Sequence, residues 1–259
     1  MVCGAYRRLL KGDQRVGDLT GFYERIARCQ ADYHERPIFI CFFGDSNTRG
    51  WGNGSIQYRD AYPTRLLEAL HDYYPGCTFN GINSGIAGNT LTQALGRIER
   101  DVLRYEPDLV IIAFGLNDSM AGQEHLPQFR ASLRTAIQTI RARSAVVLLT
   151  PNMMATRTND LVPVPYREAI YDFIRVQTNG ILDEYVNAVR IAARDLSVPL
   201  ADTYRTWQQM AASGIDTTRL LANGINHPYG YAHRLFADAL LACISGNASG
   251  MLVQGSPPE

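Results

Sequence analysis

Two stretches of the chain consist entirely of hydrophobic residues, and each stops at a small polar motif. They span residues 38–43 and 109–114. Runs of this length without polar alternation are typical of strands buried on both faces of a parallel sheet. Three shorter stretches are predicted as further strands of the same sheet. They cover residues 78–82, 145–149 and 198–201, and the last two of these are apolar. The pattern therefore predicts five strands.

Helical spacing of apolar residues separates these strands along the chain. The predicted helices cover residues 18–36, 63–73, 90–105, 127–143, 166–196 with a break at 179–180, and 230–244. A proline-spaced loop over residues 150–165 is long enough to form the wall of a pocket. Strands that alternate with helices predict an α/β fold with a mostly parallel sheet covered on both faces, and ligands bind such sheets at the carboxyl ends of the strands.

Four polar stretches lie at or near that edge of the predicted sheet, and together they carry the groups that acyl transfer needs. Ser46, in Gly-Asp-Ser directly after the first strand, is the candidate nucleophile, and His227 is the candidate base. Gly88 and Asn117 follow other strands and would supply uncharged N–H donors to an oxyanion. The backbone N–H of Ser46 itself would be a third donor. Each stretch alone has a structural reading as a helix cap, a bend or a turn, so the interpretation depends on their convergence.

These residues give the chain a resemblance to the SGNH hydrolases, also called the GDSL esterase and lipase family. The four motifs occur in the family's order, and the resemblance spans roughly residues 38–245. It implies a three-layer α/β/α sandwich of flavodoxin-like type, metal-free ester hydrolysis through an acyl-enzyme, and acyl or acetyl ester substrates. We therefore divide the chain into a helical extension over residues 1–36, an SGNH hydrolase domain over 37–250 and a tail over 251–259.

The chain departs from this family at the group that orients the histidine. The family usually has an Asp three residues before the catalytic His, and here that position is Gly224. Asn223, one residue earlier, is a candidate for the same place, although an amide stabilises an imidazolium poorly and can favour the wrong tautomer. A carboxylate from Asp202 or Asp216 is a second account. We favour a third, a Ser–His dyad in which a backbone carbonyl orients His227.

The composition excludes several other classes of function. The charged residues balance at 25 basic and 25 acidic, with no block of one sign, so neither nucleic acid nor an anionic membrane is an expected partner. The five cysteines are odd in number and widely spaced, which fits neither a disulfide framework nor a zinc site. We expect no metal and no cofactor. No apolar run has the length of a signal peptide or a membrane span, and these features predict a soluble, cytoplasmic protein.

Three functions are compatible with the sequence. The leading hypothesis is a serine esterase of small or medium acyl esters, including O-acetyl groups on sugars, so the expected partner is a small acyl ester. The same site would serve an acyltransferase, because water and an alcohol compete for one acyl-enzyme. The third function is a ligand-binding protein that has lost turnover with the family Asp. We expect the other histidines and Trp51, Met153 and Met154 to be structural. The sequence does not indicate the oligomeric state.

Overall fold

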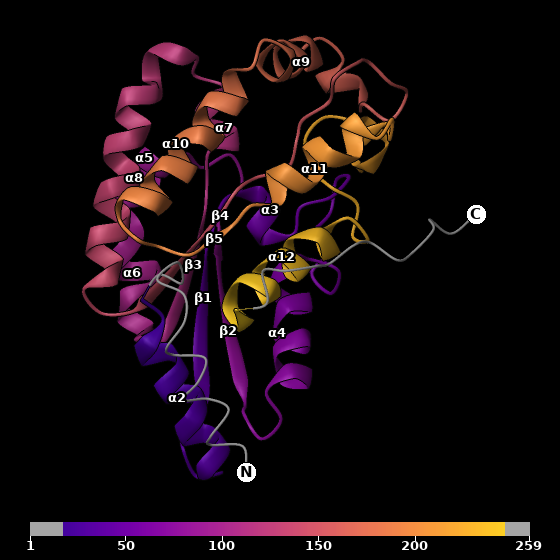
Figure 1. The fold of residues 1–259 in the computed structure, drawn as a ribbon. Helices are drawn as coiled ribbons and strands as arrows, with labels where there is room; N and C mark the ends of the chain where they lie inside the picture. The colour runs from indigo at the N-terminus through magenta and orange to yellow at the C-terminus, as the bar shows by residue number, and fades with distance from the viewer. Residues whose placement is uncertain (1–17, 247–259) are drawn as a thin grey trace.

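The computed structural model describes residues 18–246, and its centre is a five-stranded parallel sheet (Figure 1). In sheet order the strands are β2 (Phe79–Gly85), β1 (Ile38–Gly44), β3 (Leu109–Ala113), β4 (Ala145–Leu149) and β5 (Leu200–Ala201). This order is flavodoxin-like, and its strand order reverses between β1 and β3. The predicted fold class is confirmed, and ligands of such sheets bind at that reversal.

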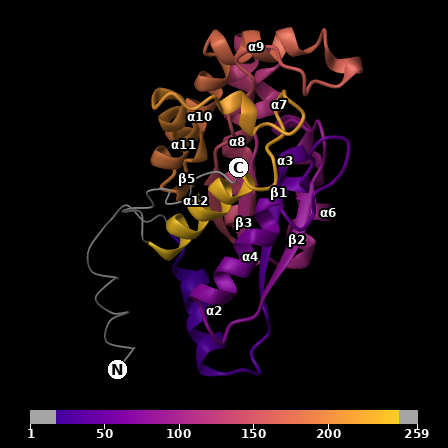
Figure 2. The same ribbon diagram turned by 90° about the vertical axis from the view of Figure 1, so that its right-hand side faces the viewer.

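Helices cover both faces of the sheet, as Figures 1 and 2 show from two sides. One face packs against α2 (Thr20–Ala31), α4 (Tyr62–Tyr73) and α12 (His233–Ser245). The other packs mainly against α5 (Leu91–Ala94), α8 (Leu126–Arg141) and α10 (Ile181–Asp195). Alternate residues of β1 enter the two cores, which explains why its sequence is apolar without a break.

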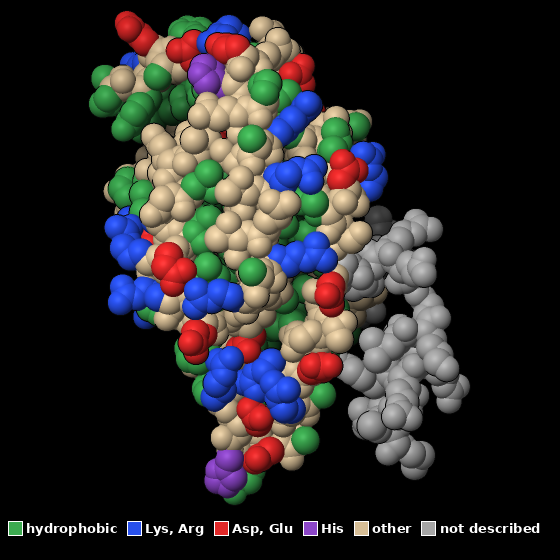
Figure 3. Space-filling view, turned by 90° about the vertical axis from the view of Figure 1, so that its left-hand side faces the viewer, with side chains coloured by type: hydrophobic (Ala, Val, Ile, Leu, Met, Phe, Trp, Pro, Cys, Tyr) green, Lys and Arg blue, Asp and Glu red, His purple; other side chains and the backbone are tan. Residues whose placement is uncertain are grey.

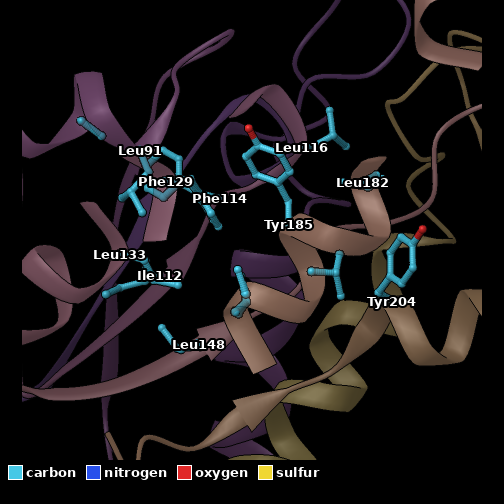
Figure 4. Packing of buried hydrophobic residues seen from close by; sticks show 14 of the residues in the cluster. Leu91, Ile112, Phe114, Leu116, Phe129, Leu133, Leu148, Leu182, Tyr185 and Tyr204 are labelled. Carbon is cyan, nitrogen blue, oxygen red and sulfur yellow. The ribbon is translucent and has the colours of Figure 1, made fainter. Parts of the chain in front are cut away.

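The core on the α8 side is built from large side chains of helices and strands that pack together (Figure 4). Phe129 of α8 and Tyr185 of α10 lie with their ring centroids 5.0 Å apart. Beneath them are Ile112 of β3 and Leu148 of β4, and all four side chains are almost fully buried. Burial of a side chain of this size is worth ~1.5–3 kcal/mol. This core therefore supports the strand ends that carry the polar motifs.

The single helix predicted over residues 90–105 is wrong. That segment is divided into α5, η1 (Leu95–Arg97), α6 (Ile98–Asp101) and η2 (Leu103–Tyr105). Arg97 lies at the interruption with its guanidinium inside the protein, where it donates to the carbonyl oxygens of Gly44 at 3.1 Å and Ser84 at 2.7 Å. The segment therefore follows the ends of β1 and β2 instead of continuing as one regular helix.

Helix α2 shares the core of the domain. Phe22 and Ile26 are each 1% exposed, and Arg25 donates to Asp108, directly before β3, at 3.1 Å. This part of the predicted extension is thus packed against the sheet. Residues 1–17 of the extension and the tail over 251–259 lie outside the described residues.

Several shorter elements complete the chain. The predicted helix over 166–196 does break at Gly180, whose φ of 75° is left-handed, so the chain forms two helices there. Helix α11 (Thr203–Ala212) follows β5 and was not predicted. The remaining elements of the described chain are α3 (Ser46–Arg49), α7 (Leu116–Ser119), η3 (Gln123–His125), η4 (Val164–Tyr166), α9 (Ile170–Thr178) and η5 (Thr217–Leu220).

The surface carries charges of both signs. Figure 3 shows Arg side chains interspersed with Asp and Glu over one face of the molecule. Within residues 18–246, no helix combines the length and apolar character that a membrane crossing requires.

Candidate active site

Ser46 lies where β1 leaves the sheet and α3 begins. Gly44 is the last residue of the strand, and a Cβ there would overlap the Thr48 hydroxyl and approach the Ala113 carbonyl. The close turn thus requires glycine. Asp45 caps α3 by accepting the N–H of Asn47 at 2.9 Å. Ser46 is the first residue of α3, so its own N–H has no partner within the helix.

His227 faces this serine across the sheet edge. Its Nε2 lies 2.9 Å from Ser46 Oγ. A tight loop holds the ring, because the N–H of Ala222 donates to the His227 carbonyl at 2.7 Å and Leu221 pairs with Pro228. Burial lowers the pKa of His227 to about 4, against an opposing contribution from the Gly52 backbone. The imidazole is therefore neutral at pH 7, the charge state that a general base needs.

The Asn223 side chain occupies the other edge of this ring. Its Nδ2 lies 3.1 Å from His227 Nδ1. Its Oδ1 accepts the backbone N–H groups of Ile225, Asn226 and His227, each at 3.0 Å. Three donors on one oxygen fix the orientation of the amide, so an N–H faces the ring. Of the groups considered for this position, the Asn223 amide is the one that lies against Nδ1, and a backbone hydrogen bond of Gly52 also acts on the ring.

Neither alternative carboxylate reaches the histidine. Asp202 caps α11 and forms an ion pair with Arg190 at 2.9 Å. Asp216 caps η5 and pairs with Arg157, whose hydrogen bond holds the pKa of Asp216 below its ordinary value. Both carboxylates are thus committed to other partners.

The amide of Asn223 determines the tautomer of the resting histidine. An amide N–H can only donate, so the neutral ring accepts at Nδ1 and carries its proton on Nε2. That proton points to Ser46. To take a proton from Ser46, the neutral ring must instead carry its proton on Nδ1, where it would meet the Asn223 N–H. The site therefore has the parts of a Ser–His pair but holds the ring in the less reactive form.

Gly88 and Asn117 lie on either side of the serine turn. Gly88 has a left-handed φ of 73° in the turn after β2, and its N–H takes part in none of the turn and loop hydrogen bonds of residues 18–246. Asn117, after β3, points its Nδ2 at the carbonyl oxygen of Asn89 at 3.2 Å and at Asp45 at 3.4 Å. Asn117 thus contacts the turn that carries Ser46 through Asp45, and its amide has weak partners, while Gly88 follows the strand next to β1 in the sheet.

Two buried carboxyl groups support these turns. Asp118 accepts the N–H groups of Leu91 at 2.8 Å and Gly115 at 3.1 Å, and burial raises its pKa to about 6 despite those bonds. Burial raises the pKa of Asp45 to about 7; the N–H of Asn47 opposes that shift, and the nearby charge of Asp118 adds to it. These two groups therefore titrate near neutral pH.

Two further asparagines belong to the site and were not predicted. Asn152, three residues after β4, accepts the side-chain N–H of Asn47 at 2.8 Å and donates to the Asn226 carbonyl at 3.0 Å. Asn226 in turn accepts the Asn223 side chain at 2.9 Å. A polar residue just beyond a buried strand was the available signal for Asn152. The sequence around Asn226 contains no comparable signal that this residue belongs to the site.

Three other residues singled out in the sequence pack in the interior. His233 is 1% exposed and stacks on Tyr62 with ring centroids 6.1 Å apart. Met153 and Met154 are buried in the hydrophobic core on the α8 side. Among the residues that the structure describes, no three His, Cys, Asp or Glu side chains form a group that could hold a metal ion.

The cavities restrict where an acyl group can lie. A cavity behind the serine turn, lined in part by Asp45, Asn47 and Thr150, has a volume of about 10 Å³, room for roughly one water molecule. It is too small for an acyl chain. A larger hollow of about 550 Å³, beside Arg25 and Arg36, lies at the opposite edge of the sheet. Neither of these two cavities offers room for an acyl chain beside Ser46.

The chain is similar to known esterases in sequence and in fold. The model of the GDSL-like lipase/acylhydrolase family matches residues 42–235. The chain is 26% identical to an acetylxylan esterase of Geobacillus stearothermophilus, over 78% of this chain and 91% of that protein. It is 28% identical to an uncharacterised lipoprotein of Bacillus subtilis strain 168, over 74% and 81%. The crystal structure of a Geobacillus stearothermophilus acetylxylan esterase has a TM-score of 0.61 at 22% identity, over 80% of this chain and 94% of that one.

Proposed function

Because this chain belongs to the GDSL-like lipase/acylhydrolase family and is a carboxylic ester hydrolase, we propose that it cleaves small or medium acyl esters through an acyl-enzyme on Ser46. The observation that carries this proposal is the distance of 2.9 Å between Ser46 Oγ and His227 Nε2. A nucleophile and a base at this separation are the minimum for acyl transfer.

Each step of the reaction has a group to perform it. Ser46 Oγ attacks the ester carbonyl carbon while its proton passes to His227 Nε2. The oxyanion that develops accepts the N–H groups of Ser46 and Gly88 and the side chain of Asn117. His227 then gives the proton to the departing alcohol. A water molecule then attacks the acyl group on Ser46 while His227 takes its proton. His227 returns this proton to Ser46 Oγ as the acyl group leaves as the free acid.

The amide of Asn223 makes this a slow member of its class. The imidazolium that forms in each transition state lacks a charged partner, and the resting ring must first exchange its tautomer. Replacement of the Asp of a native triad by Asn costs ~10⁴ in kcat. This site evolved with an amide, so its deficit is smaller than that figure.

Acetyl esters of sugars are the first substrates to test. The similarity to an acetylxylan esterase covers nine-tenths of that relative. A ligand-binding protein without turnover is the second candidate, and Asn223 is the observation that favours it. Transfer to an alcohol would use the same acyl-enzyme.

One set of assays separates these functions. The protein and a Ser46→Ala variant are incubated with p-nitrophenyl acetate, p-nitrophenyl butyrate and acetylated xylo-oligosaccharides, and a fluorophosphonate label is mapped by mass spectrometry. We expect turnover and a label on Ser46, both absent in the variant. A label on another residue, or equal turnover by the variant, would refute the serine mechanism. Binding of acetylated sugars without turnover would favour the second candidate.

A cytoplasmic location stays a prediction. One relative is named a lipoprotein, so the two compartments should be compared directly. Cell fractionation followed by immunodetection tests the prediction, and recovery in the membrane fraction would overturn it.

A further inference from the structure

Four buried asparagines connect the serine turn to the histidine loop. We call Asn47, Asn152, Asn226 and Asn223 the asparagine network. Each is less than a tenth exposed. The contacts run from Asn47 to Asn152 at 2.8 Å, from Asn152 to the Asn226 carbonyl at 3.0 Å, and from Asn223 to the Asn226 side chain at 2.9 Å. The Asn223 amide then reaches His227.

Asn152 is the centre of this network. Its side chain is fully buried, and all of its polar atoms are used. The oxygen accepts from Asn47, and the nitrogen donates to the carbonyls of Met153 at 2.8 Å and Asn226 at 3.0 Å. Its two long-range partners are the residue after Ser46 and the residue before His227. They lie 105 and 74 positions away along the chain.

We propose that Asn152 is a positioning residue that sets the separation of Ser46 and His227. This inference rests on the proposed function, since it concerns the geometry of the same pair. One rigid amide bonds to the chain beside each reacting group, so a shift of Asn152 moves the two groups relative to each other. Catalytic pairs must be held within ~0.5 Å. The adjoining bond from the Ala155 N–H to the Ile225 carbonyl, at 2.7 Å, strengthens the same connection.

Core packing alone does not account for this residue. An apolar side chain at position 152 would leave the Asn47 N–H and the Asn226 carbonyl buried without partners, which is costly. Within the described residues, Asn47 Oδ1 already has no hydrogen-bond partner. Burial of these amides costs free energy of folding. In return they connect the serine turn to the histidine loop.

Asn159 offers a matched control. It also bonds the histidine loop, by donating to the Gly224 carbonyl at 2.8 Å, and its oxygen accepts the Leu161 N–H. Within residues 18–246, Asn159 makes no side-chain hydrogen bond to the serine turn. Removal of Asn159 thus weakens the histidine loop without cutting the connection to Ser46.

The test compares Asn152→Ala with Asn159→Ala on p-nitrophenyl acetate, after thermal unfolding shows that both are folded. We expect Asn152→Ala to lower kcat by about 10²-fold with KM little changed, as for a misplacement of ~1 Å. Asn159→Ala should leave kcat nearly unchanged. Equal losses in the two variants would mean that general loosening of the loop is the cause, and would overturn the proposal.

A second readout does not depend on turnover. Nitrogen NMR of the His227 ring should show a protonated Nε2 and an unprotonated Nδ1 in the natural protein. In Asn152→Ala the two signals should shift toward those of a mobile ring that averages both tautomers, whereas in Asn159→Ala they should not. Unchanged signals in Asn152→Ala would refute the positioning role. This result holds even if no ester is hydrolysed and Ser46 is not labelled, an outcome that would refute only the proposed function.

If Asn152→Ala does not fold, Asn47→Leu cuts the network at its other end. The leucine removes the side-chain N–H that Asn152 accepts and leaves the Asn226 contact intact. A fall in kcat with a shift in the His227 ring signals supports the proposal, and values like those of the natural protein overturn it.

Discussion

Asn223 Nδ2 lies 3.1 Å from His227 Nδ1, at the ring edge opposite the one that faces Ser46. A donor therefore occupies the position from which an acceptor would activate the histidine. The three backbone N–H groups on Asn223 Oδ1 prevent the amide from turning its oxygen to the ring.

Asn223→Asp should raise kcat. One carboxylate oxygen can keep the three backbone N–H groups, and the other would accept a proton on His227 Nδ1, which selects the reactive tautomer and stabilises the imidazolium. The gain should exceed tenfold but fall well short of ~10⁴, because the Asn226 oxygen beside the new carboxylate must turn away. Steady-state kinetics with Asn159→Asp as the control checks this. An unchanged kcat would mean that the Asn223 amide already orients His227 and supports its charged form as well as a carboxylate would.

Asn117→Ala should lower kcat more than it raises KM. Its amide has only weak partners in the free protein, at 3.2 and 3.4 Å, so it is available to an oxyanion that exists mainly in the transition state. Loss of one such donor is worth ~10²–10³. Steady-state kinetics separates the two constants, and a change confined to KM would assign Asn117 to substrate binding.

Gly88→Val should also lower kcat, through the backbone. A Cβ at this position would meet no atom within 4 Å, so the strain comes from the left-handed φ of 73°, which a β-branched residue avoids. The turn would then change its conformation, and the backbone N–H of residue 88 would no longer point toward the oxyanion. Gly180→Val is the matched control, with a φ of 75° and equally open space between α9 and α10. If both variants lose activity alike, the effect is one of stability.

The acid limb of activity should lie near pH 4. The neutral imidazole is the base, and burial lowers the pKa of His227 to about 4, so activity persists below the ordinary histidine range and disappears as the pH falls through that value. The profile of kcat/KM against pH measures this. A midpoint near 6.5 would contradict it if the midpoint stays there in Asp45→Asn and Asp118→Asn, since the pKa values of these two carboxyl groups are about 7 and about 6. In Asn223→Asp the midpoint should move up, since a carboxylate favours the charged ring.

A chelator should leave activity intact, because no step assigned to Ser46 or His227 calls on a metal. Activity is measured before and after dialysis against EDTA, with added zinc as the second arm. Loss of activity that zinc restores would contradict the proposed mechanism.

The sequence predicted best those features that depend on local pattern. The strands β1 and β3 are unbroken apolar runs, and the Ser46 and His227 motifs stand beside recognisable turns. The broken segment around Arg97 was missed because its bonds go to carbonyls at the ends of other strands. Asn152 and Asn226 were missed for the same reason. A buried amide is recognisable only by partners that the fold brings to it.

The orientation of the Asn223 amide likewise could not be predicted from the sequence. The spacing before His227 permitted an amide, a distant carboxylate or a carbonyl. The backbone N–H groups of residues 225–227 decided among them, and they converge only once the loop has closed.

The loop that fixes Asn223 also affects how the protein ages. Asn223 precedes Gly224, and in a flexible chain an Asn-Gly pair loses ammonia readily when the glycine nitrogen attacks the side-chain amide. Here the Gly224 N–H is bonded to the Leu221 carbonyl at 3.0 Å, and both atoms of the Asn223 amide have partners. The folded loop thus protects the genetically encoded amide. Chain that has spent time unfolded would accumulate isoaspartate and aspartate at position 223, because the cyclic imide left by the loss of ammonia opens at either carbonyl. The storage history of a preparation would therefore influence its measured rate.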